Sequence, residues 1–319
     1  MLDDKEIVRL TRRLLEPYEL PDDCPYLSED QRELCKLTPE ERMEWWGEWL
    51  MMSHGDGRLK SFGSSTFRRE DALTPNPIRK VLSVMRSHRV RFLLMGGQAC
   101  VLYGGAEFSR DTDIAILCEE PNLRRLREAL DELHARQIAV PSLSPEYLRK
   151  GHAVHFRCRH PEAQGIRIVV MSVMRGVEGF PRLWDRRTTA DLGEGEKIDL
   201  LSLPDLVAAK KTQRDKDWPI ITRLVEANYA SAGDTPTREQ VGFWLKECRS
   251  PGLLRELAGR FPEHKDVLSK ERALLAMIPS ATDIEIEAAL QEEEFAERRK
   301  DRKYWDPLRR ELEHLRRQR

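Results

Sequence analysis

Two carboxylates separated by a single residue offer the clearest chemistry in this sequence of 319 residues. Asp111 and Asp113 open a stretch whose apolar residues predict a β-strand over residues 112–117. Side chains at positions i and i+2 of a strand point to the same face, so both carboxylates could bind one cation. Mg²⁺ is a hard cation that prefers such oxygen ligands. An Asp-x-Asp pair is also common in ordinary surface turns, so the neighbouring residues must decide between these interpretations.

A pair of glycines precedes the carboxylates, at the end of a strand predicted over residues 90–95. Gly96 and Gly97 have no side chains, so their backbone can approach phosphate groups closely, although they could equally serve a tight strand–helix turn. Gln98 then begins a predicted short helix whose N-terminus would favour an anion. Ser109 could hydrogen-bond to a phosphate or cap the turn. Glycines and carboxylates together predict a site for a nucleotide and Mg²⁺.

Two sequence blocks carry a resemblance to a known superfamily. The glycines and carboxylates resemble the signature of DNA-polymerase-β-type nucleotidyltransferases, which is an apolar residue, Gly-Gly or Gly-Ser, a spacer and an Asp-x-Asp. The closer resemblance is to the abortive-infection, type IV toxin–antitoxin branch, in which Gly-Gly-x-Ala precedes Phe-Ser-x-Asp-x-Asp, as in residues 96–99 and 108–113. The second block, residues 201–211 followed by residues 214–217, fits the same branch.

The resemblance implies an activity and a role for each motif residue. The activity is metal-dependent transfer of a nucleoside monophosphate from a nucleoside triphosphate to a hydroxyl on RNA (tRNA-like) or protein, in a toxin–antitoxin or phage-defence setting with an antitoxin as a possible partner. The implied cofactor is Mg²⁺ or Mn²⁺. The implied catalytic and metal-binding residues are Asp111 and Asp113, and the implied nucleotide-binding residues are Gly96, Gly97, Ser109, Lys210 and Lys211. Only one of the two adjacent lysines can point to the site from a helix, and a solvated basic patch is the alternative.

One residue departs from the pattern of the superfamily. Active members carry a third carboxylate on a later strand, and the resemblance places it at Val169, which can neither hold a cation nor accept a proton. Asp199 and Glu194 are nearby in the sequence and could substitute. The departure supports an alternative hypothesis from another class: a catalytically degenerate protein of the same fold that binds nucleotide or a protein partner.

The order of predicted elements favours an α/β (α+β) fold with a small mixed sheet and flanking helices, as in nucleotidyltransferases. We expect a helical N-terminal region and linker over residues 1–74, the core over 75–230, and a helical C-terminal region over 231–319 with a long charged terminal helix. The core strands are predicted at 90–95, 112–117, 152–158 and 166–173. The core helices are predicted at 77–88, 98–103, 121–135, 203–211 and 218–227.

Both flanking regions allow two interpretations. Thr38-Pro39 predicts a helix start, followed by an aromatic stripe of Trp45, Trp46, Trp49 and Leu50 that either packs on the core or forms a surface for a partner or a base. The terminal helix either docks on the body or uses its arginines from Arg298 onward to hold RNA. The residues predicted to dock are Phe295, Tyr304, Trp305, Leu308, Leu312 and Leu315.

Composition narrows the class of protein. A formal net charge of −1 argues against a wholesale basic nucleic-acid binder and leaves room for a local basic groove. The absence of a long apolar run and of a leader pattern predicts a cytoplasmic chain without membrane attachment. None of the six cysteines has zinc-site spacing, so we expect reduced thiols. His155 and Cys158 fall on opposite faces of a predicted strand, so the nearby histidines do not predict a zinc site.

Overall fold

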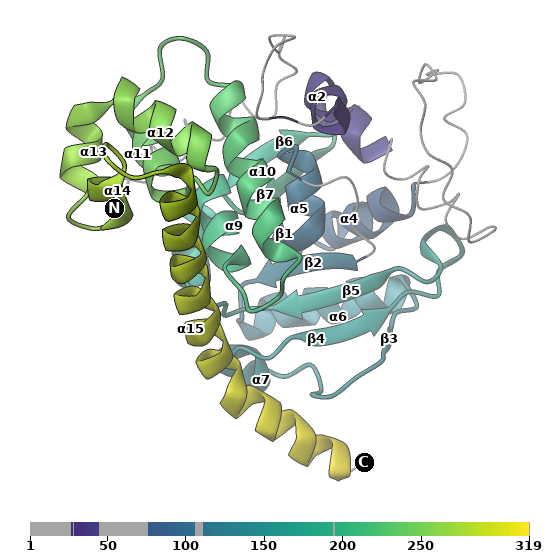
Figure 1. Ribbon diagram of the computed structural model, residues 1–319. Helices are drawn as coiled ribbons and strands as arrows, with labels where there is room; N and C mark the ends of the chain where they lie inside the picture. The colour runs from purple at the N-terminus through teal and green to yellow at the C-terminus, as the bar shows by residue number, and fades with distance from the viewer. Residues whose placement is uncertain (1–26, 28, 45–75, 106–110, 194, 319) are drawn as a thin grey trace.

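A seven-stranded mixed sheet forms the centre of the molecule (Figure 1). The computed structural model describes residues 27, 29–44, 76–105, 111–193 and 195–318. The strand order is β3-β4-β5-β2-β1-β7-β6, with β2–β5 and β1–β7 parallel and the other neighbours antiparallel. The strands are β1 (Phe92–Met95), β2 (Asp111–Ile116), β3 (Arg136–Gln137), β4 (Val154–Arg157), β5 (Arg167–Met171), β6 (Thr188–Asp191) and β7 (Lys197–Leu200).

Helices surround this sheet and follow it along the chain. Helix α6 crosses behind β4 and β5 in Figure 1, whereas α10 and α15 lie nearer the viewer. The helices are α2 (Glu29–Lys36), α4 (Pro77–Ser87), α5 (Gly96–Leu102), α6 (Glu120–Glu132), α7 (Pro145–Lys150), η3 (Pro161–Ala163), α8 (Phe180–Asp185), α9 (Leu203–Lys210), α10 (Asp217–Ala230), α11 (Arg238–Glu247), α12 (Pro251–Arg260), α13 (Pro262–Leu268), α14 (Leu274–Met277) and α15 (Asp283–Arg317). The mixed α/β class expected from the sequence is confirmed.

The core strands and helices predicted from the sequence are all present. Strands β1, β2, β4 and β5 and helices α4, α5, α6, α9 and α10 confirm the predicted elements, with shifts of a few residues at their ends. Strands β3, β6 and β7 and helices α7 and α8 were not predicted. Because β7 pairs with β1, the unpredicted β6–β7 hairpin extends the sheet beyond the strand that precedes the glycines.

Alternation along the central strands separates a core face from a polar face. Ile114 on β2 and Ile168 and Val170 on β5 are fully buried, whereas Asp111 and Asp113 of β2 and Arg167 of β5, on the other face, are only partly buried. Leu123 and Leu126 of α6 are fully buried in the same hydrophobic core. This pattern is expected of a strand that packs one face on helices.

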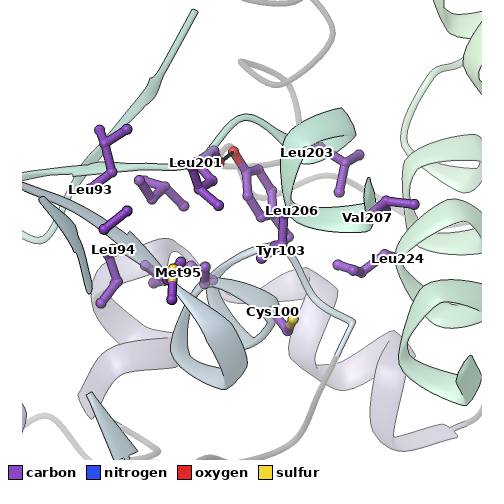
Figure 2. Close-up of a cluster of buried hydrophobic side chains, with 14 of the residues drawn as sticks. Leu93, Leu94, Met95, Cys100, Tyr103, Leu201, Leu203, Leu206, Val207 and Leu224 are labelled. Atoms are coloured by element: carbon purple, nitrogen blue, oxygen red, sulfur yellow. Dashed lines mark hydrogen bonds between the residues drawn. The ribbon is translucent and has the colours of Figure 1, made fainter. Parts of the chain in front are cut away.

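One continuous hydrophobic core joins the sheet to the C-terminal helices, with members from Met43 to Leu290. Figure 2 shows the part of this core between β1, α5 and α9, in which Tyr103 is completely buried beside Leu201 and Leu206. The Tyr103 hydroxyl donates a hydrogen bond to the Leu201 carbonyl oxygen at 2.8 Å, so the buried phenol is satisfied. The core thus holds α5, which begins with the two glycines, against α9, which ends at Lys210.

The flanking regions agree with the sequence only in part. Thr38 accepts a hydrogen bond from the Glu41 N–H at 3.1 Å and residues 39–44 are helical, which confirms the predicted helix start. The aromatic stripe from Trp45 to Leu50 lies outside the described residues, as does the predicted linker. In α15, Leu308 is buried as predicted, but the prediction for Phe295 is wrong because its side chain is 53% exposed.

Helix α15 packs along the body through ionic contacts as well as apolar ones. Asp301, on its inner face, accepts a hydrogen bond from Arg175 Nε at 3.1 Å and another from the Gln213 N–H at 2.9 Å. It thereby ties together the loop after β5 and the loop after α9. In the part of the chain that the structure describes, no helix has the length and apolar character needed to cross a membrane.

Candidate functional site

The two carboxylates of β2 lie on one face of the sheet beside β5. Asp113 is in register with Val169 of β5, and Asp111 is in register with Arg167. Residues in register on neighbouring strands point to the same face. On the far side of β5, His155 of β4 is in register with Val169. We call these five residues the carboxylate face.

Gly96 and Asp113 are packed directly against each other. Gly96 has a φ of +69°, which a residue with a side chain rarely adopts. A Cβ atom at this position would lie 1.9 Å from Asp113 Oδ2. The next residue, Gly97, donates a backbone hydrogen bond to the Asp113 carboxylate. Gly96 is therefore needed to seat the Asp113 carboxylate, and Gly97 contributes its backbone N–H, whether or not the pair also approaches phosphates.

The Asp113 carboxylate is buried, and its neighbours compensate only in part for the lost hydration. Burial raises its pKa to about 6, and the neighbouring Asp111 charge acts in the same direction. Lys210, Arg214 and the Gly97 N–H oppose this shift without cancelling it. A divalent cation between Asp111 and Asp113 would stabilise the ionised form of Asp113.

Asp111 is already paired with a cation of the chain. Arg167 Nη2 lies 2.5 Å from Asp111 Oδ2, and the two side chains are 42% and 31% exposed. An ion pair exposed to this degree is worth about 0–1 kcal/mol, because water screens it. A divalent ion or a phosphate could therefore displace it at little cost.

The structure separates the roles of the two adjacent lysines. The Lys210 side chain is nearly buried, and its Nζ lies 3.2 Å from Asp217 Oδ1. Its charge reaches Asp113, whose pKa it lowers. Lys211 instead pairs with Glu247 of α11 at 2.6 Å. Of the two candidates, only Lys210 lies near the carboxylate face.

A buried acid at the start of α10 holds Lys210 in place. Asp217 is completely buried and accepts hydrogen bonds from the Thr212 hydroxyl at 2.5 Å and from Arg214 Nε at 2.8 Å, besides Lys210. Burial raises the pKa of Asp217, but Lys210, Arg214 and Thr212 outweigh it and keep that pKa below its ordinary value. Arg214 and Asp217 thus form a local ion pair at the start of α10.

The place of the third acid is taken by an apolar side chain. Val169, adjacent to Asp113, is only 6% exposed. The possible substitute Asp199 is engaged elsewhere, because it lies 3.1 Å from Arg187 and accepts a hydrogen bond from Thr189 at 2.5 Å. Glu194 lies outside the described residues. Within the described ranges, no group of three or more histidine, cysteine, aspartate or glutamate side chains could hold a metal ion.

Arg167 and His155 are the residues of this face that sequence reasoning did not select. Burial and the Arg167 charge lower the pKa of His155 below the ordinary 6.5, and Asp111 acts in the opposite direction. A neutral imidazole thus lies one strand beyond Val169. The alternation of the predicted strand places His155 on one of its faces, but only the register with β5 shows which residues share that face.

The other histidines and cysteines near β4 do not assemble with His155. His152 Nε2 lies 2.7 Å from Glu311 of α15, and His160 Nδ1 accepts a hydrogen bond from the Glu162 N–H at 3.2 Å. Cys158 is completely buried, and burial raises its pKa to about 12. His152 and His160 thus have separate partners, each away from His155.

Ser109 lies outside the described residues, so its predicted contact with phosphate stays a prediction. Neither the scan against protein-family models nor the search of curated proteins finds a match to this sequence.

Proposed function

We propose that this chain is a divalent-metal-dependent nucleotidyltransferase with a nucleotidyltransferase-like core. The observation that carries the proposal is the surroundings of Asp113. This carboxylate is desolvated, seated on Gly96 and Gly97, and placed beside Asp111 and the buried Lys210. A carboxylate pair next to a glycine turn and a lysine suits a metal-bound triphosphate.

In the proposed reaction, a hydroxyl oxygen of the acceptor attacks the α-phosphorus of a nucleoside triphosphate. The bond from oxygen to the α-phosphorus forms, the bond to the β-phosphate oxygen breaks, and pyrophosphate leaves. Asp111 and Asp113 would hold Mg²⁺ or Mn²⁺, which supplies positive charge to the triphosphate. Lys210 would add a fixed positive charge, and the Gly96–Gly97 turn would leave room for the phosphates. The hydroxyl proton passes to water, because Val169 cannot accept it.

The acceptor belongs to the same proposal. A hydroxyl on a tRNA-like RNA or on a protein follows from the resemblance of residues 96–113 and 201–217 to the toxin-type branch. A toxin–antitoxin or phage-defence setting, with an antitoxin as partner, follows from the same resemblance and stays a prediction.

A transfer experiment tests the proposal. The protein is incubated with Mg²⁺ or Mn²⁺, each α-labelled nucleoside triphosphate in turn, and cellular RNA or protein. We expect label in one acceptor class and its loss in Asp111→Asn/Asp113→Asn. A matched control is Asp131→Asn/Asp234→Asn, which removes two exposed carboxylates outside the face and should retain transfer. Label that persists in the Asp111/Asp113 variant would contradict the proposal.

A second candidate is favoured by the side chains of β5. Val169 supplies no third acid and Arg167 pairs with Asp111, so the face suits nucleotide binding better than efficient transfer. This candidate predicts binding of metal and nucleotide without transfer. A Val169→Asp variant separates the two: newly gained transfer identifies a degenerate site, whereas transfer already present in the natural chain supports the enzyme.

A further inference from the structure

Strand β5 brings a permanent cation to the carboxylate face. Arg167 is in register with Asp111, and its Nη2 lies 2.5 Å from Asp111 Oδ2. A guanidinium remains charged at every relevant pH and presents several donors in one plane. The charge that a divalent ion would bring to Asp111 is thus partly supplied by the chain itself.

The guanidinium of Arg167 is partly exposed, and its hydrogen-bonding capacity is only partly used. Its side chain is 42% exposed, and its Nε is buried with no hydrogen-bond partner among the described residues. A buried donor without a partner is costly, so a ligand that satisfies it gains binding energy. Phosphate oxygens suit this role because a guanidinium can donate two parallel hydrogen bonds to them.

The effect of Arg167 extends across the face. Its charge helps lower the pKa of His155, which lies on β4 beyond β5, after burial as the larger cause. Arg157, by contrast, is exposed and in register with Arg167 on the side away from Asp111. The two arginines are therefore near neighbours, and Arg167 is the one that pairs with Asp111.

We propose, building on the proposed function, that Arg167 exchanges partners when nucleotide binds. Without nucleotide it occupies Asp111 and competes with a divalent ion. With nucleotide its guanidinium turns to the phosphates and leaves Asp111 to the ion. Metal and nucleoside triphosphate then bind cooperatively, since each favours the same position of Arg167.

The test measures Mn²⁺ and nucleotide affinities separately in Arg167→Gln. Free Mn²⁺ is followed by electron paramagnetic resonance, first without nucleotide and then with a non-hydrolysable α,β-methylene triphosphate. Loss of a competing surface ion pair should tighten Mn²⁺ binding without nucleotide by about fivefold. Loss of charged hydrogen bonds to phosphate should weaken nucleotide binding by about tenfold or more. A merely structural role for Arg167 would not move these two affinities in opposite directions.

Two further variants complete the experiment. Arg157→Gln removes a neighbouring exposed charge and should change neither affinity by more than about twofold. Arg167→Lys keeps the charge and loses the planar fork, so it should retain much of the competition with Mn²⁺ but less of the nucleotide affinity.

The outcomes separate this inference from the proposed function. Unchanged or weaker Mn²⁺ binding by Arg167→Gln, or equal effects of Arg157→Gln, would overturn the partner exchange even if the natural chain transfers nucleotides. Tighter Mn²⁺ binding with unchanged nucleotide affinity would overturn the phosphate contact. The natural chain could show no transfer while its Arg167→Gln variant still shows both opposite shifts. This result would contradict the proposed transferase activity and support the role of Arg167 in binding.

Discussion

At the scale of single residues, the seat of Asp113 is the most constrained feature of the face. Its carboxylate occupies the space where any side chain at Gly96 would lie, and the backbone there is left-handed. Position 96 therefore requires a glycine for two reasons, which are the left-handed backbone and the contact with Asp113. Gly165 has a left-handed backbone without such a contact, so it allows the two effects to be measured separately.

Gly96→Ala should lower the free energy of unfolding by about 3 kcal/mol. The left-handed backbone should account for about 1–2 kcal/mol of this loss, and the clash with Asp113 for a similar amount. The matched control is Gly165→Ala, where φ is +83° and nothing lies within 4 Å of an added Cβ. It should cost only about 1–2 kcal/mol. Urea unfolding of both variants measures the difference. Equal losses would show that Asp113 does not fill the space above Gly96.

The carboxylate face also sets the pKa of His155. Burial lowers it first and Arg167 second, so Arg167→Gln should raise the His155 pKa toward, but not fully to, its ordinary 6.5. An NMR titration of the imidazole measures this, with Arg157→Gln as the variant expected to leave the pKa unchanged. Because the folded-state pKa lies below the unfolded one, His155 reduces stability as pH falls through about 6.5. A His155 pKa in Arg167→Gln equal to that of the natural chain would contradict the geometry of the carboxylate face.

At the scale of elements, the turn between α9 and α10 is built around one buried acid. Asp217 accepts hydrogen bonds from Lys210, Thr212 and Arg214, which lie before it in the chain. The lysine nearest the carboxylate face is therefore positioned by the first residue of the next helix. Removing the acid would leave a cation buried without its partner.

Asp217→Asn should lower the free energy of unfolding by about 3–5 kcal/mol at neutral pH, because Lys210 keeps its charge in a buried position. The natural ion pair should contribute fully at pH 7 and lose its contribution only as pH falls below about 3.8, since the pKa of Asp217 is lowered on folding. Replacing both partners, as Lys210→Met/Asp217→Leu, should cost less than Asp217→Asn alone. Urea unfolding at pH 7 compares the three chains, and a double variant less stable than the single one would contradict this account.

Elements with strong apolar patterns could be predicted from the sequence, and pairings between distant elements could not. Periodicity identified β1, β2, β4 and β5. It missed β6, in which Ala190 is the one apolar residue, and β7, in which Lys197 and Asp199 alternate with the apolar residues. The choice between Lys210 and Lys211 depends on how α9 rests against α10 and α11. The contact between Arg167 and Asp111 depends on the register of β5 against β2, which no local pattern specifies.

At the scale of the whole molecule, the last helices of the predicted core and the C-terminal helices share contacts across the boundary predicted at residue 230. The Trp244 indole N–H of α11 donates to Asn228 of α10 at 2.8 Å, and Lys211 pairs with Glu247. Arg249 lies over the Trp218 ring, 4.7 Å from its centroid. With one continuous hydrophobic core, these contacts favour unfolding as a single cooperative unit.

Two buried thiols can test this cooperativity, because they lie on opposite sides of that boundary. Cys100 in α5 and Cys248 at the end of α11 are completely buried, and burial raises their pKa values to about 11 and about 12. A buried, protonated thiol reacts only after the structure around it opens. Pulse alkylation in increasing urea, followed by peptide mass spectrometry, should therefore give the same midpoint for both. Cys118, which is only partly buried, should react without urea and serves as the internal control. A lower midpoint for Cys248 would show that residues 231–319 open separately from the sheet, in which case Lys211 and Arg175 would lose their partners on α11 and α15 while the carboxylate face stayed folded.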